Sequence, residues 1–189
     1  MAQTSTTISG KKDFKSAITI DATCTFTSAT KKITASGTSL SDLQVRDLIT
    51  ITGSASNNST FTISEVDANG TFVIVEEDVT SETVAADTVL TYVGFVTAKV
   101  KGDGYYSQTD GLHTVAYHVD NTCTGALKMQ GSLSTTPTED DFFDIDGTTF
   151  TTDQSTTINS VNFTGNFVWV RAKLTANTAG SVTKILFNN

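Results

Sequence analysis

The chain has 189 residues, with 12 Lys and Arg against 20 Asp and Glu and a formal net charge of −8. A nucleic-acid-binding surface needs clustered basic residues, so this balance argues against nucleic acid as a partner. No run reaches the ~18 apolar residues of a membrane-spanning helix, and the amino terminus carries no apolar signal region, so we expect no membrane partner. About a fifth of the residues are threonine, a β-branched residue that favours strands with one solvent-facing side.

Residues 1–17 are polar, rich in Ser and Thr, and show no sustained period. We expect an extended N-terminal arm that orders against a partner or a neighbouring subunit, with a frayed terminus as the alternative. Phe14, near the end of this segment, and Ile18, directly after it, are candidate interface residues. The first folded unit is expected to start at residue 18.

Residues 18–94 alternate between apolar and polar positions in short runs, which is typical of strands. Helical spacing is confined to residues 39–46, and Asn69-Gly70 favours a type I′ hairpin turn, in which both central residues take positive φ. Strands are expected at 24–27, 32–35, 48–52, 60–64, 71–75 and 89–93. This regular spacing predicts a small β-barrel or compact sandwich as the N-terminal unit.

Residues 95–189 predict a second unit, an antiparallel β-sandwich of the jelly-roll or immunoglobulin-like kind. In the run from 167 to 172, Val168 and Val170 are assigned to the core, which places Trp169 on the opposite face as a candidate interface residue. Strands are expected at 95–101, 113–119, 125–133, 142–146, 156–163, 167–174 and 182–187.

The acidic residues between 139 and 146 are the one candidate metal site. Alternating carboxylates supply oxygen ligands to Ca²⁺, but the complete calcium-loop pattern is missing, so we favour solvated acidic strand edges and expect no cofactor. His113 and His118 are an odd number of positions apart, so a strand places them on opposite faces. Cys24 and Cys123 are expected to be buried thiols rather than a disulfide.

No nucleophile motif of the G-x-S-x-G type occurs, so we expect no enzyme activity. The segment from 102 to 106 offers an interaction site instead, because adjacent Tyr105 and Tyr106 follow flexible glycines. Tyrosine is enriched at interfaces, where it gives a large contact area at low entropy cost. The two readings of this segment are a binding loop and a tight turn whose tyrosines cover one end of the sandwich.

Two parts of the sequence resemble structural proteins of tailed bacteriophages. The stretch from 45 to 84, VRDLITITGSASNNSTFTISEVDANGTFVIVEEDVTSETV, resembles a β module repeated in such proteins. It departs from that module at Arg46, where the module often has Gly. The stretches 113–147 and 162–187 resemble the sandwich of structural proteins from marine, cyanophage-like tailed phages.

The resemblance implies a non-enzymatic virion protein that is assembled in the cytoplasm of the bacterial host. The favoured role is a capsid decoration (cement) protein that binds the outer capsid surface, with the major capsid protein as partner and with self-association or multivalent binding on the capsid lattice. The alternatives are a tail, neck or baseplate-associated structural protein and, less favoured, a carbohydrate-binding β-sandwich module.

Overall fold

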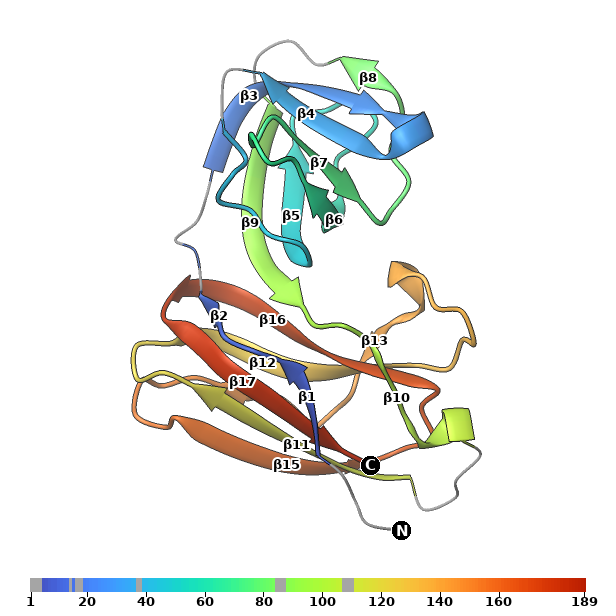
Figure 1. Ribbon diagram of the computed structural model, residues 1–189, viewed down its shortest axis with the longest axis vertical. Helices are drawn as coiled ribbons and strands as arrows, with labels where there is room; N and C mark the ends of the chain where they lie inside the picture. The colour runs from blue at the N-terminus through green and yellow to red at the C-terminus, as the bar shows by residue number, and fades with distance from the viewer. Residues whose placement is uncertain (1–4, 14, 16–18, 37–38, 84–87, 107–110) are drawn as a thin grey trace. The chain divides into compact units, whose positions relative to one another are not determined.

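A computed structural model of the protein describes residues 5–13, 15, 19–36, 39–83, 88–106 and 111–189 (Figure 1). The fold is all-β, as predicted: antiparallel strands form a sandwich-like arrangement, and the helical segments in these ranges are short 3-10 turns. Within the same ranges, no helix has the length and apolar character needed to cross a membrane. The chain divides into two compact units, 17–95 and 96–189 with 1–16. We call them the barrel unit and the sandwich unit.

The amino-terminal segment differs from the expected partner-dependent arm. Strands β1 (Thr6–Ser9) and β2 (Lys12–Asp13) both pair antiparallel with β17 (Ser181–Asn188). Ile8 of β1 is buried, with 7% of its surface exposed. The edge strand of a sheet has a row of unpaired backbone N–H and C=O groups. At this edge of β17, those groups pair with the backbones of β1 and β2. Residues 6–9 and 12–13 are therefore paired within their own chain.

The barrel unit closes on itself through one long strand. The first residues of β3 pair with β9, and its later residues pair with β4, so the path β9-β5-β6-β7-β4-β3 returns to β9. Closure removes free edges, which otherwise invite pairing with another chain. The elements are β3 (Thr19–Thr27), η1 (Ser28–Thr30), β4 (Lys32–Ser36), β5 (Asp47–Thr52), β6 (Thr60–Val66), β7 (Phe72–Val75), β8 (Glu82–Thr83) and β9 (Thr88–Val96).

The barrel interior follows from the period-two pattern of the strands. In β4, for example, Ile33 and Ala35 are buried while their neighbours are partly or fully exposed. The residues 39–46 are hydrogen-bonded turns rather than the expected helical turn, with the amide of Leu43 donating to the carbonyl of Leu40 at 3.0 Å. Both leucines are nevertheless buried in the barrel core, so apolar spacing identified the core residues but not the backbone conformation.

The turn between β6 and β7 also differs from the prediction. Gly70 has a φ of 66°, but Asn69 is not among the residues of positive φ, so the turn is not type I′. The carboxylate of Asp67 instead accepts hydrogen bonds from the amide and hydroxyl of Thr71, at 3.1 and 2.7 Å. A Cβ at position 70 would lie 2.6 Å from the amide nitrogen of Ser41, so close packing as well as φ requires glycine there.

One carboxylate organises the loop between β5 and β6. Glu82 of β8 accepts hydrogen bonds at 2.7 to 3.1 Å from the hydroxyl of Ser54, the amides of Ala55 and Ser56, and the side-chain amide of Asn57. These hydrogen bonds, that from Ser54 foremost, lower the pKa of the Glu82 carboxyl below its usual value of 4.5. The charged form of Glu82 thus stabilises the fold.

We expect the stability of the barrel unit to fall as the pH decreases below about 4.5. A depressed pKa means that the unfolded chain binds the proton more readily, so stability present above 4.5 is lost as the pH falls through the folded-state pKa. Thermal unfolding followed by circular dichroism between about pH 3 and pH 7 measures this. Glu82→Gln should flatten the pH dependence, whereas Glu65→Gln, at an exposed site on β6, should not. Identical profiles for Glu82→Gln and the parent would contradict the assignment.

The sandwich unit has two sheets. One has the order β1-β17-β11-β15, and the other combines β13, β12 and β16 with β10 and β14 as short additional strands. Tyr117 of β11 stacks on Phe150 of β14, with ring centroids 6.1 Å apart, so the two sheets face each other across the core. The remaining elements are β10 (Val100–Lys101), η2 (Asp103–Tyr106), β11 (Leu112–Val119), β12 (Thr124–Ser132), η3 (Glu139–Asp141), β13 (Phe143–Asp144), β14 (Phe150–Thr151), β15 (Ile158–Thr164) and β16 (Trp169–Ala179).

The predicted register of the run from 167 to 172 is correct for Val170, which is fully buried, and Trp169 is half-buried. The assignment of Val168 to the core is wrong: it lies in a bend just before β16 and is only half-buried, because the strand and its two-residue period begin at Trp169. His113 is fully buried and His118 is partly exposed, which confirms that β11 places them on opposite faces.

The two cysteines are free and buried, as predicted. Cys24 belongs to the barrel unit and Cys123 to the sandwich unit. Burial raises the pKa of both thiols. The reactive thiolate is therefore disfavoured at each position.

Candidate aromatic and lysine binding surface

Three residues singled out from the sequence come together on the sandwich unit. The rings of Tyr105 and Tyr106 are 5.3 Å apart, and those of Tyr105 and Trp169 are 5.5 Å apart, both edge-to-face. Tyr105 and Tyr106 are 44% and 54% exposed. Both tyrosine rings are thus presented at the surface. The other two candidates, Phe14 and Ile18, lie outside the described residues.

Two lysines complete the group. The ammonium of Lys101 lies 3.9 Å from the ring centroid of Tyr105 and 5.8 Å from that of Tyr106. The ammonium of Lys99 lies 5.5 Å from the ring of Trp169 and donates to the carbonyl of Pro137 at 3.1 Å. Such cation–π contacts hold a positive charge over the negative face of a ring. We call these five residues, Lys99, Lys101, Tyr105, Tyr106 and Trp169, the aromatic–lysine surface.

The local backbone explains why the tyrosines are presented together. Gly102 and Gly104 donate their amides at 3.0 Å to the carbonyls of Val168 and Phe167. A Cβ at either glycine would lie 2.5 Å or less from a carbonyl oxygen of the facing segment, so only glycine allows this approach. The approach fixes η2, which carries both tyrosines, against the segment that leads into β16.

Trp169 is held from two sides. In the pairing of β10 with β16, Lys101 lies opposite Trp169. The indole Nε1 of Trp169 donates to the carbonyl of Thr135 at 3.2 Å. The ring is therefore fixed by backbone pairing and by its polar end, and part of its surface remains accessible.

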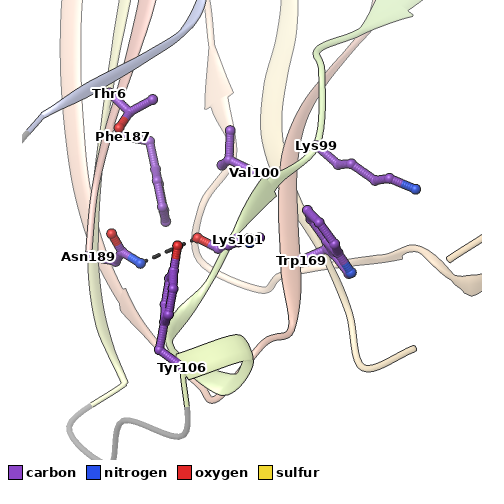
Figure 2. A pocket seen from close by; sticks show the side chains of 8 residues that line it. All are labelled: Thr6, Lys99, Val100, Lys101, Tyr106, Trp169, Phe187 and Asn189. Atoms are coloured by element: carbon purple, nitrogen blue, oxygen red, sulfur yellow. Dashed lines mark hydrogen bonds between the residues drawn. The ribbon is translucent and has the colours of Figure 1, made fainter. Parts of the chain in front are cut away.

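A pocket of about 370 Å³ opens beside this surface, within the sandwich unit. Figure 2 shows Lys99 and Trp169 on one side of the β10 backbone, with Tyr106 and Asn189 on the other. The side-chain amide of Asn189 donates to the carbonyl of Lys101 at 3.3 Å. The lining is completed by Lys101, Thr6, Val100 and Phe187. The pocket thus combines charge, hydroxyl and amide groups, and ring faces.

The acidic cluster has a structural explanation. Glu139 pairs with Arg171 at 2.6 Å, and Asp141 accepts two hydrogen bonds from Thr138 at the start of η3. Burial raises the pKa of Asp144, but hydrogen bonds from Lys128 and Gln130 outweigh it, and the net shift is downward. Among the described residues, no three His, Cys, Asp or Glu side chains are grouped to hold a metal ion.

Sequence reasoning missed the two lysines of the surface. The available signal was the spacing of Lys99 and Lys101 directly before the Gly-Asp-Gly-Tyr-Tyr segment. Their importance depends on the pairing of β10 with β16, which joins residues far apart in the sequence. Comparison with known proteins adds no assignment: no protein-family model matches the chain, and no curated protein is significantly similar to it.

Proposed function

We propose that this chain is a non-enzymatic structural protein of a tailed-phage virion, and specifically a capsid decoration protein that docks on the outer surface of the major capsid protein. The resemblance of residues 45–84, 113–147 and 162–187 to phage structural proteins supports the virion assignment. Two β units with buried cores suit a protein that must persist outside a cell.

The aromatic–lysine surface is the observation that carries the docking proposal. Tyrosine and tryptophan are the residues most often found at the energetic centres of interfaces, because they bury a large area at low entropy cost. Tyr105 and Tyr106 are exposed, and Trp169 holds the neighbouring ring in place. On a capsid lattice, many equivalent copies compensate for a modest contact area through multivalency.

The location is tested with gold-labelled antibody against this chain on intact particles of the virus that encodes it, imaged by electron microscopy. Label spread over the head supports decoration. Label confined to the tail or neck overturns the capsid role and favours a tail, neck or baseplate component. No label on intact or gently disrupted particles overturns the virion assignment.

Binding of purified protein to expanded capsids tests the docking surface. We expect Tyr105→Ala to weaken co-sedimentation with capsids by about tenfold, the effect of losing one interface centre. Ile158→Ala is the matched control, because Ile158 is 57% exposed on β15 of the same unit but lies outside the aromatic–lysine surface. Equal loss in both variants, or no loss in Tyr105→Ala, would show that capsids do not bind through this surface.

A further inference from the structure

We propose that the pocket beside the aromatic–lysine surface is a binding site for a carboxylated saccharide, such as an oligosaccharide containing hexuronic acid. This goes beyond the proposed docking function, since it assigns a small-molecule ligand to a specific cavity. The pocket measures about 370 Å³ and lies in the size range of small-ligand sites.

The pocket offers aromatic rings to a sugar. Tyr106 and Trp169 line it from the two sides of β10 (Figure 2), and Phe187, which also lines it, is only 2% exposed and adds little contact area. The negative face of an aromatic ring attracts the C–H-rich face of a pyranose, whose hydrogens carry partial positive charge. The phenol of Tyr106 also offers a polar group for hydrogen bonding, whereas the indole N–H of Trp169 already donates to the carbonyl of Thr135.

Polar groups surround these rings. Thr6 supplies a hydroxyl and Tyr106 a phenol, both able to donate and to accept. The side-chain amide of Asn189 donates one hydrogen to the carbonyl of Lys101. Its second N–H and its carbonyl oxygen can bond to a ligand. A ligand rich in hydroxyl groups matches this mixture better than an apolar ligand does.

The lysines select for negative charge. Both line the pocket, and where the structure describes the chain, neither Lys99 nor Lys101 has a carboxylate partner within 4.0 Å. Their contacts are aromatic rings and, for Lys99, the carbonyl of Pro137. Within the described residues, the two ammonium groups therefore have no ion pair, although the chain as a whole has a net charge of −8. A sugar carboxylate supplies the missing charge.

The charge distribution disfavours a polyphosphate ligand. Nucleic acid binding draws on many basic contacts along a backbone, whereas this pocket offers two lysines on an otherwise acidic chain. Two adjacent hexuronic acid residues carry two carboxylates, one for each ammonium group, and the remaining sugar hydroxyls match the neutral polar lining.

Isothermal titration calorimetry of the full chain with a galacturonic acid oligomer tests the proposal, with a neutral glucose oligomer of equal length as the comparison. We expect the acidic oligomer to bind and the neutral one to bind at least about tenfold more weakly. Lys101→Gln and Tyr106→Ala should each weaken binding of the acidic oligomer by about tenfold. Lys184→Gln, which removes the same charge from β17 outside the pocket, should leave binding unchanged.

Three results would overturn the proposal. They are no binding of the acidic oligomer, equal binding of the neutral oligomer, and equal binding of an oligomer of glutamate, which has carboxylates but no sugar rings. Folding of each variant is checked by its thermal unfolding midpoint, so that loss of binding is not confused with loss of structure. The capsid experiments do not depend on this site being occupied, so failure here leaves the docking function standing.

Discussion

Replacing Arg171 with alanine is expected to lower the free energy of unfolding of the sandwich unit by about 3–5 kcal/mol. Arg171 is 4% exposed on β16, and its guanidinium donates to the carboxylate of Glu139 at 2.6 Å and to the side chain of Gln130 at 2.9 Å. The same guanidinium lies 3.9 Å from the ring centroid of Phe142. The variant removes all three contacts.

The expected loss of stability in Arg171→Ala is large because the carboxylate of Glu139 stays in place without this partner. The side chain of Glu139 is only 17% exposed, so without Arg171 its charge is poorly solvated and has lost its ion pair with that guanidinium. Removing one partner of such a pair is more costly than replacing both, because the remaining charge keeps its desolvation penalty. We therefore expect Arg171→Met combined with Glu139→Gln to recover much of the stability that Arg171→Ala loses.

Denaturant unfolding followed by tryptophan fluorescence measures this effect, since the single tryptophan of the chain, Trp169, belongs to the sandwich unit. Lys184→Ala, at an exposed position on β17, is the control for loss of a positive charge. A loss below about 1 kcal/mol for Arg171→Ala would show that the pair behaves as an exposed surface ion pair.

Replacing Tyr117 with alanine is expected to cost about 3–5 kcal/mol, the usual range for removing a large buried aromatic side chain. Tyr117 is fully buried at the centre of β11 and stacks on Phe150. Its hydroxyl donates to the carbonyl of Thr148 at 2.9 Å, and burial raises its pKa far above the usual value, so the donor proton is retained. The cavity left by alanine would lie between the two sheets.

Tyr117→Phe separates the hydroxyl from the ring. It keeps the packing but leaves the buried carbonyl of Thr148 without its donor, which we expect to cost about 1–3 kcal/mol. The same fluorescence-detected unfolding measures both variants. Equal losses for phenylalanine and alanine would mean that the hydrogen bond, rather than the packing of the ring, dominates at this position.

The sequence predicted local features well, and failed where distant residues had to be brought together. Alternation correctly placed Val170 in the sandwich core because a strand repeats every two residues, but it also placed Val168 there, before β16 begins. It could not show that Tyr105 meets Trp169, since that contact depends on β10 pairing with β16. Likewise, a polar segment such as Thr6–Ser9 carries no signal for its partner β17 at the opposite end of the chain.

Backbone conformation was the least predictable property. Arg46 has a φ of 71°, in the region that glycine adopts most easily. Neither the composition nor the spacing of apolar residues around Arg46 indicated this conformation. The helical spacing of Leu40 and Leu43, in contrast, reflected burial against the barrel core rather than helix formation.

The pairing of β1 with β17 has a consequence for the order of folding. The barrel is an insertion within the sandwich: the chain begins the sandwich, leaves it to build the barrel, and returns at Val96. During synthesis, the whole barrel segment is translated before the sandwich strands that follow Val96. The barrel can therefore fold before β17, the partner of β1, has been made. A fault in the inserted barrel would therefore leave a long unfolded loop between β1 and β17, which raises the entropic cost of adding β1 to the edge of its sheet.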